Sequence, residues 1–154
     1  MDKNEFVTRT EQIKTRLYRT AFLYLGSENM ALDAVDESIY RGLLSVKKLR
    51  QPEYFETWIT RILINECKKE LRRRKREQPL DTIPETAEEM FDSLSLKEAL
   101  SRLPQVLKEI IILRYFTGFT LAETARSLEI PQGTVVTRQR RALSLLKLEL
   151  SEEE

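Results

Sequence analysis

Apolar residues recur along most of this chain at steps of three and four positions, the spacing that places them on one face of an α-helix. The first series predicts a helix over residues 5–25, after which Gly26 supplies a stop and Ser27 an N-cap for the next helix. A second helix is expected over residues 28–49. Pro52 marks the start of a third helix, because proline suits the first helical turn.

The helical spacing resumes after residue 93 and predicts further helices. They are a helix that ends near Leu103, a helix from Pro104 to Phe116, a short helix from Thr120 to Leu128 and a long helix over residues 131–150. Gly118 is the expected residue just beyond the second of these helices, and Thr120 is the expected N-cap of the short one.

Between the two helical series lies a stretch of different composition, "EQPLDTIPETAEEMFD" at residues 77–92. It holds two prolines and several acids but no lysine or arginine, a composition typical of an interdomain linker. We therefore expect an all-α protein of two small helical domains, residues 1–76 and residues 93–154, joined by a flexible acidic linker.

The composition of the 154-residue chain also favours an all-α fold, since 33% of its residues are charged and only four are glycine. Its hydrophobic content of 41% is enough for one compact domain or two small ones. The formal net charge is only +1, so the overall balance does not indicate a nucleic-acid partner. Only the distribution of charge along the chain can do so.

Two residue types that enzymes and metal sites commonly use are scarce. The chain has no histidine, which removes the commonest general base and metal ligand, and its one cysteine, Cys67, cannot alone form a zinc site or an internal disulfide. We therefore expect no enzymatic activity, no metal and no cofactor. The sequence has neither a signal-peptide pattern nor a run of eighteen apolar residues, so a cytoplasmic location is expected.

Residues 120–147 follow the order of a helix-turn-helix: a short helix, a tight turn, and a second helix that begins with polar and basic positions. The small side chain of Ala125 allows the two helices to cross closely. The shared apolar core is expected to consist of Leu121, Leu128, Ile130, Val135 and Ala142. The positions expected to face outward from the second helix are Thr134, Thr137, Arg138 and Arg141.

The basic start of this second helix has two interpretations. Hydroxyl and guanidinium groups there suit contacts with phosphates and base edges, because the N-terminus of a helix favours anions. A basic amphipathic helix can equally be no more than a solvent-exposed face. The short helix and the turn with proline and glycine that precede it favour DNA binding.

Several motifs occur in a fixed order along the chain. Residues 99–150 contain a Leu-Pro pair, the pattern L-R-Y-F-x-G-x-T and the pattern I-P-x-G-T-V-x-[ST]-R. These motifs resemble region 4 of bacterial sigma factors of the extracytoplasmic-function type. The first half independently resembles region 2 of the same family, with "LYRTAFLYLGSENMALDAVDESIYRGLLSV" similar to regions 2.1 to 2.2 and "FETWITRILINECKKELRRRKR" similar to regions 2.3 to 2.4.

The resemblance implies an alternative sigma factor that directs RNA polymerase to promoters and performs no bond chemistry itself. In this family the first domain binds the clamp helices of core RNA polymerase and opens the −10 element of promoter DNA, while the last domain sits on the polymerase flap and reads the −35 element. An anti-sigma factor, soluble or membrane-bound, is a further implied partner, and no small-molecule substrate is implied.

Matching residues assign two surfaces to the first domain. The acids Asp33, Asp36 and Glu37 match the polymerase-binding segment, although the family more often has glutamine where Asp36 stands. Without the resemblance, these acids could simply complement the helix dipole. Asn65 matches the asparagine that contacts the −10 strand. The cations that would follow the phosphate backbone are Lys68, Lys69, Arg72, Arg73 and Arg74.

Aromatic residues at the start of the third helix invite a base-stacking function, but their spacing favours another interpretation. Phe55 and Trp58 lie on the same stripe as Ile59 and Ile62. We therefore expect both aromatic rings in the core.

Matching residues in the last domain assign its DNA-binding surface. Arg114 and Thr120 match positions that approach −35 phosphates. The recognition-helix surface is matched by Val136, Thr137, Arg138 and Arg141, with Thr134 facing the groove and Arg140 lying beside them.

Two positions in the last domain depart from the family pattern. Val136 stands where lysine, arginine or serine is usual; valine cannot donate a hydrogen bond but can pack on a thymine methyl group. Glu129 stands in the turn, where glycine or asparagine is commoner because the backbone tends to take a positive φ, and a non-glycine residue there costs on the order of 1 kcal/mol. The sequence therefore leaves the preferred −35 sequence open.

Two other functions remain open from the sequence. An autonomous helix-turn-helix regulator that binds operator DNA would explain the last domain but leaves the first domain less well explained. A nucleic-acid enzyme such as a recombinase, with a helix-turn-helix tail, would need a catalytic constellation, and the sequence shows no matching one.

Overall fold

The computed structural model describes residues 1–77 and 94–152. All regular structure in these ranges is helical, so the predicted all-α class is confirmed. The chain divides into two compact units, a first unit of Met1–Ile83 and a second unit of Pro84–Glu154. All but the first residue of the predicted linker, 77–92, lies outside the described residues.

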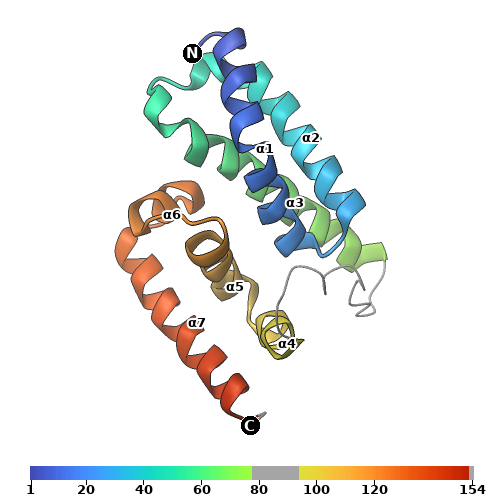
Figure 1. The fold of residues 1–154 in the computed structure, drawn as a ribbon, viewed down its shortest axis with the longest axis vertical. Helices are drawn as coiled ribbons and strands as arrows, with labels where there is room; N and C mark the ends of the chain where they lie inside the picture. Colours follow the sequence, from blue (N-terminus) through green and yellow to red (C-terminus); the bar gives the residue numbers. More distant parts are fainter. Residues whose placement is uncertain (78–93, 153–154) are drawn as a thin grey trace. The chain divides into compact units, whose positions relative to one another are not determined.

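The first unit is a bundle of three helices, each of which packs against the other two (Figure 1). The helices are α1 (Lys3–Leu25), α2 (Glu28–Ser45) and α3 (Phe55–Glu77). Two single turns of 3₁₀-helix, η1 (Val46–Lys48) and η2 (Pro52–Tyr54), connect α2 to α3.

The predicted junction between the first two helices is confirmed in detail. Gly26 adopts a left-handed conformation with φ 68°, and its N–H donates to the carbonyl of Phe22 at 2.7 Å. The hydroxyl of Ser27 then accepts a hydrogen bond from the N–H of Met30 at 3.3 Å, which caps α2. Both groups satisfy backbone positions that a helix end leaves without intrahelical partners.

The predicted end of the second helix and the predicted start of the third differ from those in the structure. The α2 helix ends at Ser45 and not at residue 49, and Pro52 begins a 3₁₀ turn and not the α-helix itself. Gln51 is extended, with φ −120° and ψ 100°, because the ring of a proline disfavours the helical conformation in the preceding residue. The apolar spacing continued through this connection because Val46 and Leu49 are both buried.

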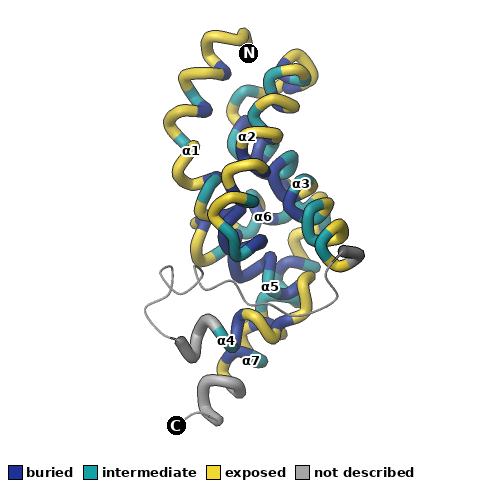
Figure 2. Tube along the Cα trace, turned by 90° about the vertical axis from the view of Figure 1, so that its right-hand side faces the viewer, coloured by how far each residue is buried: buried dark blue, intermediate teal, exposed yellow. Residues whose placement is uncertain are grey.

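The core of the first unit forms where α1, α2 and α3 approach closely. The rings of Phe6 and Phe55 meet edge to face, with centroids 5.6 Å apart. Gly42 lies against Ile59 and the ring of Phe6, since a Cβ atom at this position would be 2.5 Å from the Cδ1 of Ile59 and 3.1 Å from the Cζ of Phe6. Phe55 is therefore a core residue as predicted, whereas Trp58 is only half-buried, so the prediction for Trp58 is wrong. Figure 2 shows the buried positions recurring along these helices, with exposed positions between them.

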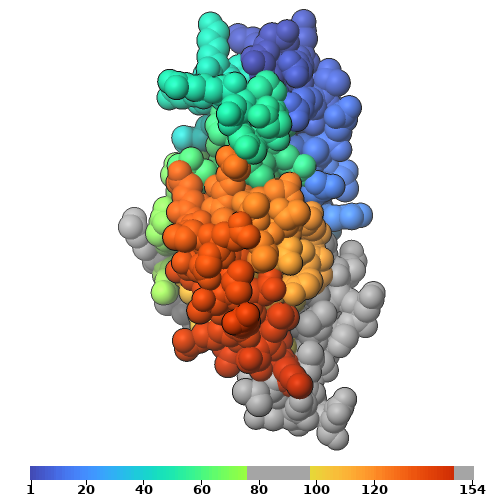
Figure 3. Space-filling model, turned by 90° about the vertical axis from the view of Figure 1, so that its left-hand side faces the viewer, coloured from blue at the N-terminus to red at the C-terminus, as the bar shows by residue number. Residues whose placement is uncertain are grey.

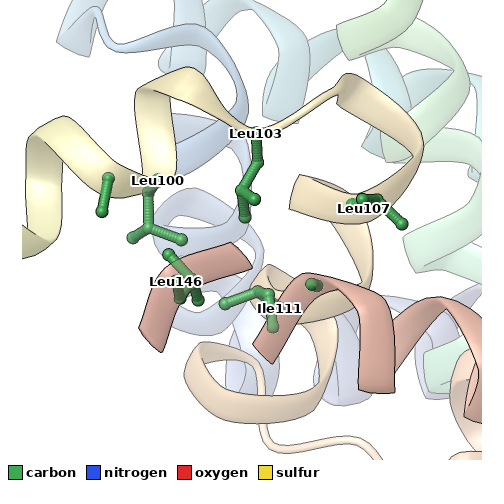
Figure 4. Close-up of a cluster of buried hydrophobic side chains, with 7 residues drawn as sticks. Leu100, Leu103, Leu107, Ile111 and Leu146 are labelled. Atoms are coloured by element: carbon green, nitrogen blue, oxygen red, sulfur yellow. The ribbon is translucent and has the colours of Figure 1, made fainter. Parts of the chain in front are cut away.

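The described part of the second unit contains five helical segments. They are α4 (Leu94–Arg102), α5 (Gln105–Ile111), the π-helical segment η4 (Ile112–Phe116), α6 (Leu121–Leu128) and α7 (Gln132–Glu152). A buried apolar cluster joins α4, α5 and α7 (Figure 4). Its members are Ala99, Leu100, Leu103, Leu107, Ile111, Ala142 and Leu146.

The helix predicted from Pro104 to Phe116 changes character in its second half. After Ile111 the backbone widens into the π-helical η4, in which the N–H of Thr117 donates to the carbonyl of Ile112 at 2.8 Å. Gly118 follows with φ 83°, which confirms it as the residue that ends the helix. π-Helical turns are rare, and no apolar pattern in the sequence distinguishes them from an α-helix.

Candidate nucleic-acid interface

The first helix of the predicted helix-turn-helix begins with a reciprocal cap. The hydroxyl of Thr120 accepts a hydrogen bond from the N–H of Glu123 at 3.1 Å, and the carboxylate of Glu123 accepts one from the N–H of Thr120 at 2.9 Å. This capping box satisfies two backbone donors and confirms Thr120 as the N-cap. It fixes the point at which α6 starts.

The turn between α6 and α7 adopts the positive φ expected at Glu129. Its backbone has φ 56° and ψ 44°, in the left-handed region. The N–H of Ile130 donates to the carbonyl of Ala125 at 3.1 Å, and the N–H of Glu129 donates to the carbonyl of Arg126 at 3.4 Å. This pair of bonds is a Schellman motif, and it closes the turn although the left-handed position carries a side chain.

The interior of the helix-turn-helix differs partly from the predicted core. Val135 and Ala142 are fully buried as expected, but three other predicted core residues are only half-buried. These three are Leu121, Leu128 and Ile130. The buried positions of α6 are instead Thr124 and Ser127. Thr124 is tolerated there because its hydroxyl donates to the carbonyl of Thr120 at 2.8 Å, a local bond that apolar patterning does not reveal.

The exposed face of α7 has its centre slightly away from the predicted one. Thr137, Arg140 and Arg141 are exposed, whereas Thr134, Val136 and Arg138 are half-buried along its edges. The buried Val135 and Ala142 define the inner side of the helix, and Arg140 lies nearly opposite it. The side chains of α6 and α7 form one continuous surface in Figure 3. The sequence placed Arg140 only beside the site, but the structure places it on the exposed face of α7 with Thr137 and Arg141.

Arg114 joins three segments of the second unit. Its Nε donates to the Oε1 of Gln139 on α7 at 2.7 Å, and its Nη1 donates to the carbonyl of Phe119 at 2.7 Å. Its guanidinium also lies 5.9 Å from the centroid of the Tyr115 ring. The side chain is half-buried. Because of its two hydrogen bonds, Arg114 holds the π-helical segment, the start of α6 and the middle of α7 together. Sequence reasoning missed Gln139.

The −10 candidates on α3 fall into two groups. Asn65, Lys69 and Arg72 are exposed, and their spacing of four and three residues places them on one face of the helix. Lys68 is half-buried beside this face. These residues form a polar and basic stripe, which we call the α3 stripe: Asn65, Lys68, Lys69 and Arg72.

The two arginines that follow the α3 stripe have partners within the first unit. Arg73 donates from Nη2 to the carboxylate of Glu70 at 2.5 Å, and this hydrogen bond lowers the pKa of Glu70 below its usual value. Arg74 donates from Nη1 to the carbonyl of Leu25 at 2.8 Å, at the end of α1. A cation at this position stabilises the carbonyl end of a helix. The basic run of α3 therefore contains exposed cations and cations that are bonded within the first unit.

Cys67, also on α3, is buried in the first unit. Burial raises the pKa of its thiol to about 12, and the neighbouring carboxylates of Glu66 and Glu70 add to the shift. The thiolate is the nucleophilic form of cysteine, so this thiol is unreactive at neutral pH.

The acids predicted to bind the polymerase lie on the exposed side of α2. Asp33, Asp36 and Glu37 are all exposed. Three large apolar residues on the same helix are also exposed, with relative accessibilities of 50% for Leu32, 59% for Tyr40 and 69% for Leu44. We call these six residues the α2 face. The apolar members were missed, although their positions outside the buried stripe of α2 could have identified them.

Arg41 connects this face to α3. Its Nε lies 2.9 Å from the carboxylate of Glu37 and 3.0 Å from that of Glu66, the residue after Asn65. The side chain of Glu66 is only 15% exposed, so Arg41 compensates a largely covered carboxylate.

Residues 1–77 and 94–152 carry neither a metal-binding cluster nor a membrane-spanning helix. Within these ranges, no group of three or more cysteine, aspartate or glutamate side chains is arranged to hold a metal ion. Among the same residues, no helix is both long enough and apolar enough to span a membrane.

Family comparisons match both units. Residues 10–77 match the family model described as Sigma-70 region 2, and residues 99–148 match the one described as Sigma-70, region 4. The chain is 35% identical over 153 residues to the RNA polymerase sigma factor SigV of Bacillus subtilis, and this match covers 96% of the chain and 92% of SigV. It is 25% identical over 169 residues to the ECF RNA polymerase sigma factor SigW of the same organism, with coverages of 97% and 90%.

A solved structure shares the fold. It is the sigma factor RpoE of Bartonella quintana, crystallised in complex with the anti-sigma factor NepR. The TM-score is 0.80 at 21% identity, and the similarity covers 97% of this chain and 99% of the other.

Proposed function

The chain belongs to the extracytoplasmic-function group of the sigma-70 family of RNA polymerase sigma factors, and from this membership we propose which of its surfaces recognise the promoter and the polymerase. As a sigma factor it is a transcription initiation factor and not an enzyme. The assignment of individual residues rests on their exposure, their partners and their match to the family pattern.

The second unit reads the −35 element through α7. Its central contacts are Thr137, Arg140 and Arg141, which are exposed on one face. Thr134, Val136 and Arg138 border that face, and Val136 is placed to pack on a thymine methyl group. Arg114 and the start of α6 at Thr120 approach the flanking phosphates, since side chains and helix N-termini commonly bind DNA phosphates.

The first unit opens the −10 element with α3. The amide of Asn65 hydrogen-bonds an unstacked base, and Lys69 and Arg72 on the same face follow the phosphate backbone. Lys68 lies beside them. The guanidinium groups of Arg73 and Arg74 contribute less, because each already has a partner within the unit.

The α2 face binds the clamp helices of core RNA polymerase. Its carboxylates Asp33, Asp36 and Glu37 meet basic groups of the clamp, and its apolar members supply area that is removed from water on binding. The second unit sits on the polymerase flap. This function places the protein in the cytoplasm, where an anti-sigma factor, soluble or membrane-bound, holds it inactive.

The observation that carries this proposal is the exposed basic face of α7 at the end of a correctly capped helix-turn-helix. The capping box and the Schellman turn fix where α6 begins and ends, and the helix that follows carries a group of exposed hydrogen-bond donors. Together these features present Thr137, Arg140 and Arg141 on one side of a rigid helix.

The experiment is run-off transcription with purified chain and core RNA polymerase on a library of promoter duplexes. We expect weak binding of duplex by the chain alone, and specific initiation with core enzyme that falls steeply with added salt. Tight, sequence-specific duplex binding by the isolated chain, without transcription after core enzyme is added, would show an autonomous regulator and refute the proposal.

A further inference from the structure

We propose that Gln139 is a positioning residue for −35 recognition and that it acts through Arg114. This inference rests on the proposed function, in which Arg114 approaches a −35 phosphate. It adds a residue that presents no charge to DNA and that the sequence pattern does not identify.

The geometry gives Arg114 two fixed attachments. The Oε1 of Gln139 accepts from its Nε, and the carbonyl of Phe119 accepts from its Nη1, both at 2.7 Å. A guanidinium carries five N–H donors in a fixed planar fork. Two attachments, one from Nε and one from Nη1, define the orientation of the group and leave three N–H donors, both of those on Nη2 among them, for a phosphate.

The carbonyl of Phe119 is itself held in place by the surrounding backbone. The N–H of Phe119 donates to the carbonyl of Leu113 at 2.8 Å, and its ring is only 2% exposed. The next residue, Thr120, is the N-cap of α6. The bond to Phe119 therefore ties Arg114 to the start of α6, and the bond to Gln139 ties it to α7.

Gln139 is the only contact of Arg114 with α7 among the hydrogen bonds of the described residues. It lies on the same turn of the helix as Arg138 and Arg140, at a half-buried position on the side of the core. An apolar residue of similar size would fill this position but would offer no acceptor to Nε. The guanidinium would then keep only its attachment to the carbonyl of Phe119, and binding would have to restrict the added motion.

The experiment compares four variants of the full chain in complete holoenzyme: Gln139→Met, Arg114→Ala, the double variant, and Gln105→Met. Gln105 is an exposed glutamine of the second unit and serves as the matched control. Binding is measured on a promoter duplex recovered from the library and on the same duplex with a scrambled −35 element. The salt dependence of binding and the thermal midpoint of each free protein are measured in parallel.

We expect Gln139→Met to weaken binding about five- to tenfold, the scale of one typical intramolecular hydrogen bond, and only when the −35 element is intact. Arg114→Ala should weaken it at least as much and reduce the salt slope by about 0.9, the value for one phosphate contact. The double variant should bind no more weakly than Arg114→Ala. Gln105→Met should behave as the unchanged protein.

Three results would overturn the inference alone. In the first, the Gln139→Met variant binds normally. In the second, the substitution weakens binding by the same factor when Arg114 has already been removed, which would mean that Gln139 touches DNA itself. In the third, it weakens binding equally on the scrambled duplex and lowers the thermal midpoint, which would mean a purely structural effect. If the unchanged holoenzyme initiates at no promoter of the library, the proposed function fails and this inference fails with it.

Discussion

Two basic helices, α3 in the first unit and α7 in the second, present their cations in different ways. On α3, Arg73 is bonded to Glu70 and Arg74 to the carbonyl of Leu25. On α7, no described residue forms an ion pair with Arg140 or Arg141, and both are exposed. The two runs look alike in the sequence.

The difference shows that a cation in a basic run can serve the fold or a partner. An arginine with an internal acceptor contributes mainly to stability, because removing it leaves a carbonyl or carboxylate without its partner. An exposed arginine without one contributes mainly to binding. Substitutions on both helices test this division.

Removing both exposed arginines of α7 should have the largest effect. The double variant Arg140→Ala and Arg141→Ala is expected to weaken −35 binding by holoenzyme about 100-fold, since specific arginine contacts to DNA contribute about 1–3 kcal/mol each. The thermal midpoint of the free protein should not change. Mobility-shift titration and thermal denaturation measure the two quantities, with Arg102→Ala, an exposed arginine of α4, as the control.

Asn65→Ala should affect a different step. Loss of the amide that bonds an unstacked base is expected to reduce open-complex formation about tenfold, with −35 binding unchanged. Permanganate reactivity of thymines in the −10 element measures opening. Normal opening in this variant would remove Asn65 from the proposed site.

Arg74→Ala should reduce stability more than DNA binding. The guanidinium caps the carbonyl end of α1, so its loss is expected to lower the free energy of unfolding by about 1–2 kcal/mol. Urea denaturation measures the loss, and Arg72→Ala on the exposed side of the same helix is the matched control. Equal stabilities of the two variants would contradict the structural role of Arg74.

Arg72→Ala and Arg73→Ala form a direct comparison between neighbours. Arg72 is exposed and Arg73 is bonded to Glu70. We expect about a fivefold loss of promoter affinity for Arg72→Ala and less than about twofold for Arg73→Ala, since one phosphate contact at most is lost in each case. The reverse order would place the DNA on the other side of α3.

Glu70→Gln should produce the smallest change, and in the opposite direction. The substitution removes a negative charge and frees Arg73, so promoter affinity should rise by about twofold, the scale of one exposed charge pair. A decrease in affinity measured by salt titration of the holoenzyme complex would show that Glu70 holds Arg73 in its binding position.

The pKa of Glu70 gives this pair a pH dependence. Because Arg73 lowers the pKa of the folded carboxyl below 4.5, the pair contributes stability above that pH and loses it as the pH falls through the lower, folded value. The stability difference between the unchanged protein and Glu70→Gln should therefore disappear in acid. Urea denaturation at neutral and acidic pH measures it.

Local signals in the sequence predicted much of the fold correctly. Gly26 with Ser27, Thr120 and Gly118 were expected from residue type and position, and the positive φ at Glu129 was expected from the family pattern. Each of these features depends on a few neighbouring residues, so the sequence contains the whole cause. Helical periodicity also predicted the outward positions of Thr137 and Arg141, whereas the acids of α2 were assigned through the resemblance to the family.

Features that depend on a distant partner were not predictable in this way. The acceptor of Arg74 lies 49 residues away in the chain and that of Arg114 lies 25 residues away. Periodicity identifies the side of a helix but not the group that faces it from another helix. For the same reason Arg140 was ranked below Arg138, although the packing of α7 exposes Arg140 more fully.

Local patterns in the amino-acid sequence specify the helices, most of their start and end points, and the motifs of a sigma factor. Packing in three dimensions specifies which cations remain exposed, where the π-helical segment widens the backbone, and that Gln139 holds Arg114. Capping and periodicity act over a few residues. Whether a long charged side chain bonds within the fold or remains exposed depends on which acceptor the folded chain brings within about 3 Å of it.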